Sequence, residues 1–199
     1  MRMLAAALFS FCLFADGPAA AKDTSLEGAK AMSKPEDVRA VAPALEGYAQ
    51  KFIEGDLWKR PGLSPRDRSI VTLAALIARN QTAELPYYLG LSLDNGVKPS
   101  EISEIITHLA FYTGWANAIN AIPAAKQLFE SRNIGVDQLP PASGPQLPLD
   151  ETAEKQRATR VAEQFGQITP SLVQYTTDVL FRDLWLRPAL APRDAAWSP

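Results

Sequence analysis

Residues 62–78 read GLSPRDRSIVTLAALIA, and this stretch decides the fold class. Ser64, Pro65 and Asp67 mark a helix start, because they supply a hydroxyl cap, a first-turn proline and an acid near the positive end of the helix dipole. The apolar residues that follow recur every three or four positions, at Ile70, Leu73, Ala74 and Ile77. The stretch therefore predicts an amphipathic helix with one buried face.

The same helical spacing continues on both sides of this stretch. Thr82 is expected to cap the next helix, and Pro99 to start the one after it. Further helices are expected at about 43–55, 84–95, 99–113 and 115–132. Alternation typical of strands is absent between them. Residues 36–132 are therefore predicted to form one all-α domain, a bundle of about five to six helices.

A second helical region follows a linker at residues 133–150, where four prolines lie between Asp137 and Leu149. Residues 170–194 match residues 43–67 without a gap at an offset of 127, with 12 of 25 positions identical. The match ends after Asp194. We therefore predict that residues 151–199 are the truncated start of a second copy of the domain, shortened either genuinely or by a shift of reading frame.

Composition narrows the function classes. The chain has 199 residues, of which 47% are hydrophobic and 21% charged, and its net charge is −2. These values indicate a globular chain of one or two domains. Since no cluster of Lys and Arg is present to displace counterions from phosphates, nucleic acid is not expected as a partner.

Residues 1–21 resemble a secretory signal peptide, with a basic start at Arg2, an apolar run and small residues before Lys22. We therefore expect a periplasmic or secreted protein, without a membrane anchor once the signal is removed. Removal of this segment also removes Cys12, the single cysteine. The mature chain is then expected to have no disulfide or Cys-x-x-Cys chemistry, and neither a metal nor another cofactor is predicted.

Three blocks of sequence resemble the carboxymuconolactone decarboxylase family, which is part of the alkyl hydroperoxidase D-like superfamily. They are GLSPRDRSIVTLAALIA (62–78), TAELPYYLGLSLDNGV (82–97) and EISEIITHLAFYTGWANA (101–118). The resemblance implies an all-helical domain that forms a homo-oligomer, a trimer or hexamer, with sites near subunit contacts. It also implies either decarboxylation of a γ-lactone or, in hydroperoxidase-like relatives, peroxidase-linked disulfide chemistry.

The chain departs from this family at two points. Hydroperoxidase-like members work through Cys-x-x-Cys, which the mature chain lacks, so peroxidase activity is disfavoured. In decarboxylase-like members a histidine typically follows four residues after the glutamate at Glu84, and here Tyr88 stands in its place. The usual pair of glutamate and histidine is therefore broken.

The residues still offer candidates for acid and base chemistry. Glu84 and Tyr88 are spaced to share one helix face, as acid or base and as hydrogen-bond donor to an oxyanion. His108, the only histidine, is the side chain best placed to titrate near neutral pH. Each also has a structural explanation: Glu84 can stabilise a helix dipole, Tyr88 can fill the core or an interface, and His108 can be a core histidine.

Substrate carboxylates would need cations, and the candidates are Arg60, Arg68 and Arg79. We expect a decarboxylase-like lyase that acts on a small lactone or carboxylated substrate. The alternative is a non-catalytic remnant that serves as an assembly or binding module, because Tyr88 replaces the family histidine and the second copy is truncated.

Overall fold

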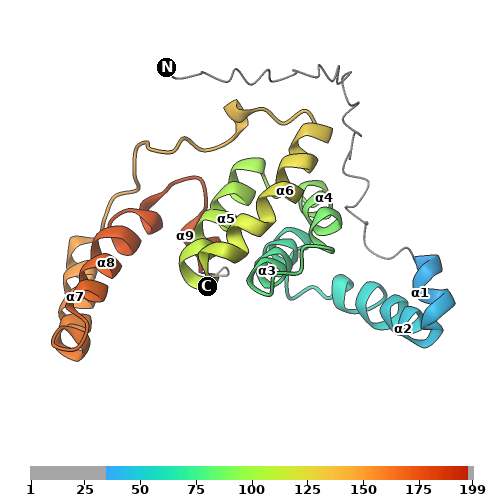
Figure 1. Ribbon diagram of the computed structural model, residues 1–199, viewed down its shortest axis with the longest axis horizontal. Coiled ribbons are helices and arrows are strands. Elements are labelled where there is room, and N and C mark those ends of the chain that lie inside the picture. The colour runs from blue at the N-terminus through green and yellow to red at the C-terminus, as the bar shows by residue number, and fades with distance from the viewer. Residues whose placement is uncertain (1–34, 197–199) are drawn as a thin grey trace, which may run out of the picture.

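The computed structural model describes residues 35–196, and this part of the chain is helical without any strand (Figure 1). The predicted all-α class is confirmed. The longer helices are α3 (Pro65–Ala78), α4 (Leu85–Asp94), α5 (Pro99–Thr113), α6 (Trp115–Ser131) and α7 (Glu151–Phe165). The shorter ones are α1 (Pro35–Val41), α2 (Pro43–Tyr48), α8 (Pro170–Tyr175) and α9 (Pro192–Ala195).

Helices α3 to α6 form the central bundle, and the core lies between their apolar faces. The predicted stripe on α3 is buried, since Ile70, Leu73 and Ile77 are almost fully shielded from solvent. Leu85 and Leu89 of α4 and Ile105 and Leu109 of α5 complete the same core. Burial of these faces supplies the hydrophobic free energy that holds the bundle together.

The helix starts follow local chemistry. Ser64 caps α3, because its hydroxyl accepts a hydrogen bond from the backbone N–H of Asp67 at 3.0 Å. The carboxylate of Glu101 accepts the backbone N–H of Lys98 at 2.7 Å and so closes the first turn of α5. Gly96 ends α4 with a φ of +89°, a value that glycine adopts without strain.

Two arms extend from opposite sides of the bundle (Figure 1). The N-terminal arm contains α1, α2 and the π-helix Ala49–Glu54, and the C-terminal arm contains α7, α8 and the π-helix Thr176–Phe181. Each π-helix is followed by a short 3-10 helix, Leu57–Lys59 or Leu184–Leu186. From α2 and α8 onward, the two series of elements occur in the same order and at the same offset of 127 as the sequence repeat, whereas α1 and α7 are not related by it.

The chain after the C-terminal arm returns to the bundle. Leu184, Leu190 and Ala195 are buried, and Leu190 and Ala195 belong to the bundle's own core. Leu190 and Ala195 therefore pack against the first domain of the same chain.

Two predictions lie partly or wholly beyond this description. The proposed signal peptide, residues 1–21, lies outside the described residues, as do residues 197–199. Within residues 35–196, no helix is both long and apolar enough to cross a membrane. The domain boundaries and the second copy stay predictions.

Candidate functional site

His108 lies on the face of α5 that the returning chain covers, and only 1% of its surface is exposed. Its Nδ1 lies 3.2 Å from the backbone carbonyl oxygen of Glu104. Because a carbonyl oxygen only accepts hydrogen bonds, this contact assigns the proton of the neutral ring to Nδ1. Nε2 is then the nitrogen with the free lone pair, and within the described residues it has no hydrogen-bond partner.

The surroundings of His108 favour its neutral form. Burial lowers the pKa of the imidazole below the ordinary value of 6.5, and the positive charge of Arg187 acts in the same direction. The carbonyl and the carboxylate of Glu104 oppose this shift without reversing it. The indole of Trp185 meets the imidazole edge to face, with ring centroids 5.8 Å apart. At neutral pH His108 is therefore a neutral proton acceptor that is shielded from solvent by apolar groups.

A buried ion pair lies one helical turn before His108. The carboxylate of Glu104 is fully buried and accepts hydrogen bonds from Nε and Nη2 of Arg187, at 2.7–3.0 Å. Arg187 also donates to the carbonyl oxygens of Pro141 and Ala142 at 3.1 Å. Glu104 raises the pKa of Arg187 through these hydrogen bonds, so the guanidinium stays charged. The pair ties the linker and the returning chain to α5.

A cavity of about 380 Å³ opens beside this ion pair. Its walls are Glu104 and Arg187, the linker around Pro141 and Gly144, and Ala189. A small organic acid fits a space of this size. Glu104 lines this cavity, whereas His108, one turn later on α5, does not.

Tyr88 belongs to a second cluster, next to the joint between the N-terminal arm and α3. Its ring is stacked on Trp58 at 6.4 Å and meets Tyr87 edge to face at 5.0 Å. Burial raises the pKa of Tyr88, and Tyr87, Glu84 and Glu54 raise it further. The phenol is therefore protonated near neutral pH and available as a hydrogen-bond donor.

Glu84 is the residue just before α4, where it takes the N-cap position without making a side-chain cap bond. It influences Tyr88 electrostatically, as the shared spacing predicts. In the described part of the chain, no hydrogen bond or ring contact joins Glu84 or Tyr88 to His108. The structure thus separates the candidate catalytic residues into two clusters.

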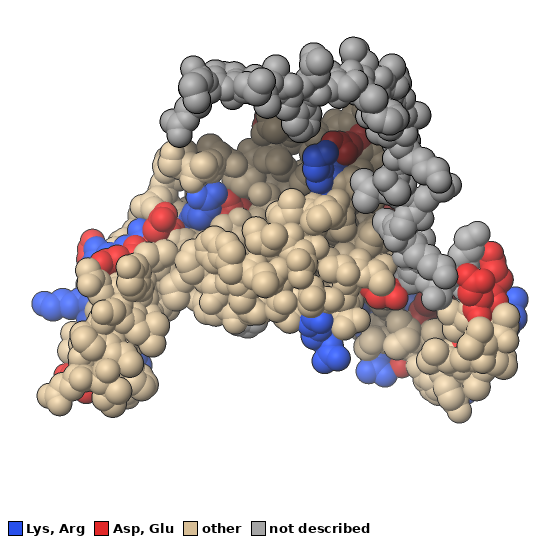
Figure 2. All heavy atoms as spheres, in the orientation of Figure 1, with Lys and Arg blue, Asp and Glu red and all other residues tan. Residues whose placement is uncertain are grey.

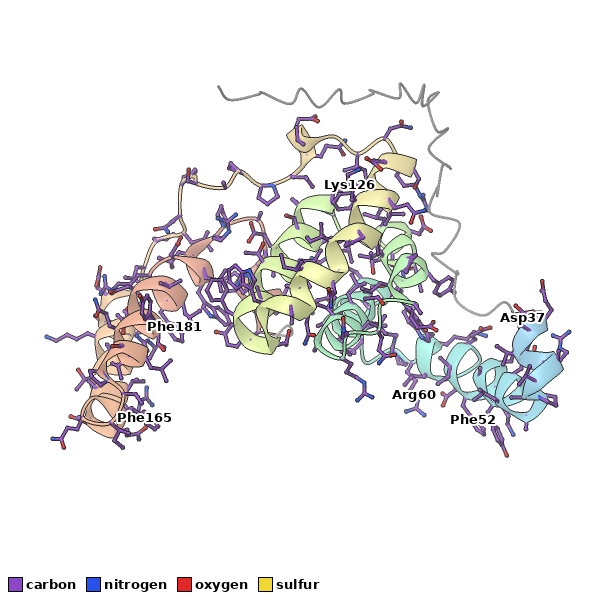
Figure 3. All side chains as sticks on the ribbon, in the orientation of Figure 1. Asp37, Phe52, Arg60, Lys126, Phe165 and Phe181 are labelled. Atoms are coloured by element: carbon purple, nitrogen blue, oxygen red, sulfur yellow. The ribbon has the colours of Figure 1, made fainter. Side chains whose placement is uncertain are left out.

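The candidate arginines also lie apart. Arg60 is exposed and pairs with Asp56 at 2.6 Å, at the joint between the N-terminal arm and α3 (Figure 3). Arg68 is buried beneath Trp58, with its guanidinium 5.9 Å from the ring, and donates to the carbonyls of Arg60 and Leu63. Arg79 is exposed and follows the last residue of α3. Arg79 follows Arg68 by eleven positions, which corresponds to about 16 Å along a helix.

Sequence reasoning missed Glu104, Trp185 and Arg187. A glutamate four residues before the only histidine on one helix was a visible signal, because such residues share a helix face. Trp185 and Arg187 stood out in the repeat, but nothing local indicates that they contact α5. In residues 35–196, no group of three His, Cys, Asp or Glu side chains is arranged to hold a metal ion.

Comparison with known proteins adds independent findings. The family model described as carboxymuconolactone decarboxylase family matches residues 43–127. A 4-carboxymuconolactone decarboxylase of Acinetobacter baylyi is 32% identical over 95 residues, which are 48% of this chain and 71% of the relative. A nitrosuccinic acid decarboxylase of Metarhizium robertsii is 37% identical over 68 residues, which are 34% of this chain and 48% of the relative.

Proposed function

The chain belongs to the carboxymuconolactone decarboxylase family, and from this we propose that it is a lyase that removes CO2 from a small carboxylated or lactone substrate. The two relatives named above support decarboxylation as the reaction type. Their names differ in the substrate, so the substrate proposed here is a class of small organic acids. The observation that carries the proposal is the buried imidazole of His108, whose Nε2 is free of partners within the described residues.

Decarboxylation breaks a C–C bond and leaves the electron pair on carbon while CO2 departs. The pair must be delocalised into a neighbouring electron-withdrawing group, and the carbon then takes a proton from an acid. In our proposal His108 takes up a proton at Nε2 as a base and then gives it to this carbon as the general acid. Its lowered pKa makes the imidazolium a stronger acid than an ordinary histidine, although a smaller fraction is protonated at pH 7. A dry, apolar wall such as Trp185 also favours dispersal of the substrate's charge.

Glu84 and Tyr88 take supporting roles in this proposal where a subunit contact brings their cluster beside His108 of another copy, since the two clusters are separate within one chain. The protonated phenol of Tyr88 donates a hydrogen bond to a developing oxyanion, and Glu84 sets its electrostatic surroundings. Arg68 lies over Trp58 of this cluster, and Arg60, two residues after Trp58, can exchange its exposed partner Asp56 for a substrate carboxylate. Arg79, at the far end of α3, is not required.

The direct test is CO2 release from 4-carboxymuconolactone and from nitrosuccinic acid. We expect turnover of at least one of them, and a loss of about 10²–10⁴-fold in His108→Gln, the range typical of a lost general acid. Glu84→Gln and Tyr88→Phe are expected to lose less. Wild-type turnover that His108→Gln leaves unchanged would contradict the role of His108.

The second candidate function is a non-catalytic assembly or binding module. It is favoured by the way Trp185 and the returning chain cover His108, and by Tyr88 in the place of the family histidine. Tyr88→His separates the two candidates: if the wild-type chain is inactive and this substitution creates turnover, the chain is a remnant. A peroxidase remains disfavoured because its cysteine pair is missing from the sequence.

The setting of this activity is also part of the proposal. The N-terminal residues support export to the periplasm or the medium. The apolar arms support a homo-oligomer, with a trimer or hexamer as the family expectation. Figure 2 shows that the undersides of both arms consist mainly of uncharged residues. Leu45 and Tyr48 on one arm and Leu172 and Tyr175 on the other are all more than half exposed.

A further inference from the structure

Helices α3 and α9 meet through two ion pairs that mirror each other. Arg66 donates to Asp194 at 2.7 Å, and Arg193 donates to Asp67 at 2.7 Å. Arg193 and Asp194 follow Arg66 and Asp67 by 127 positions, so each pair is the image of the other under the sequence repeat. Contacts related in this way are characteristic of a two-fold interface, in which the same patch serves on both sides.

The docking segment, residues 183–194, continues this interface across α5. Leu184 is 3% exposed, and Arg187 binds the buried carboxylate of Glu104. Trp185 packs against His108 and Tyr112, and its indole N–H donates to the Tyr112 hydroxyl at 2.6 Å. Each of these side chains has an identical counterpart 127 positions earlier, in Leu57, Trp58 and Arg60.

In the equivalent segment, residues 56–67, two of these counterparts have no covering surface. They are Leu57 and Arg60. Leu57 is 40% exposed, whereas Leu184 is buried. Arg60 has only an exposed ion pair with Asp56, the kind of pair that contributes little to stability. A segment with the same apolar and cationic residues is thus presented to solvent beside the bundle.

We infer that the face of α5 around Glu104, His108 and Tyr112 is a docking site for residues 56–67 of a second copy of this chain, and that residues 183–194 occupy it in cis. Two copies that exchange these segments form a closed, two-fold dimer. In that dimer Arg60 binds Glu104 of the other copy, and Trp58 packs on its His108. The inference concerns a surface and does not rest on the proposed activity.

The docking segment belongs to the same chain as α5, and this covalent link explains why it occupies the docking site instead of a second copy. A linked segment has an effective concentration in the millimolar range, which a second copy at micromolar concentration cannot match. Exchange also has a consequence for the candidate site. Because Tyr88 stacks on Trp58, docking of Trp58 brings Tyr88 to the edge of the other copy's His108, and the two clusters then share one interface.

The test releases the docking segment and measures the mass of the full chain by light scattering. We expect Trp185→Ala/Arg187→Ala to double the mass relative to wild type at the same concentration. Adding Trp58→Ala and Arg60→Glu should restore the wild-type mass. Arg39→Glu is the matched control, because Arg39 is also an exposed arm arginine paired with a glutamate, and it should leave the doubled mass unchanged.

A second measurement keeps the inference falsifiable if the double variant unfolds. A fluorescent peptide of residues 56–68 is titrated into wild type and into Arg187→Ala, with helical content checked by circular dichroism. We expect at least tenfold tighter binding to the variant, and none by a peptide carrying Arg60→Glu. A folded variant that neither doubles in mass nor binds the peptide would overturn the inference, as would doubling that ignores Trp58 and Arg60.

Discussion

His108 is the residue whose surroundings make the clearest prediction. Its pKa is lowered, so the folded state binds a proton less readily than the unfolded chain, and stability falls as pH drops below about 6.5. We expect the single imidazole signal in proton NMR to titrate below 6.5. Trp185→Ala, which exposes the ring, should raise this midpoint. A wild-type midpoint at or above 6.5 would show that the ring is solvated or paired.

The buried ion pair between Glu104 and Arg187 predicts an effect on the free energy of unfolding that the sequence did not suggest. Arg187→Ala leaves a fully buried carboxylate without its partner, which typically costs about 3–5 kcal/mol. Adding Glu104→Gln removes the stranded charge and should recover a large part of that loss in urea unfolding. If the double variant is as unstable as Arg187→Ala, the buried charge is not the cause. The sequence contains both residues, but their meeting depends on long-range packing across 83 positions.

Helix starts show how far local chemistry predicts an element. Ser64 and Thr82 both have the sequence of a cap, but only Ser64 accepts the backbone N–H of its helix. Helix α4 begins three residues after Thr82, with Glu84 at the N-cap. Ser64→Ala should therefore cost about 1 kcal/mol in chemical unfolding, and Thr82→Ala much less. Equal losses of unfolding free energy would mean that the two hydroxyls stabilise their helix starts to a similar extent.

The apolar pattern of the sequence predicts some of the helices and does not predict others. Strong periodicity with a cap or an N-terminal proline predicted α3 and α5 to within a residue or two. The π-helices at 49–54 and 176–181 were expected as ordinary helix, because one extra residue per turn leaves no signature in the apolar spacing. The candidate site was predictable only in part, since His108 and Tyr88 could be named but their separation could not.

At the scale of the whole molecule, the repeat places equivalent residues in unequal environments. Leu57 and Leu184 have the same neighbours in sequence, including a following tryptophan, but only Leu184 is buried. Sequence alone could show the equivalence and not the difference, because the difference arises from which surface each segment reaches. This makes the pair an internal control for the contribution of burial to stability.

Leu184→Ala should remove a buried side chain and cost about 2–5 kcal/mol, whereas Leu57→Ala removes a partly exposed one and should cost under about 1 kcal/mol. For a chain of this size, each kcal/mol lowers Tm by about 2–4 °C, so calorimetry separates the two variants easily. Both substitutions have the same helix propensity and the same effect on the unfolded chain. A difference in Tm therefore measures the burial of Leu184. Equal shifts would mean that Leu184 is as exposed in solution as Leu57.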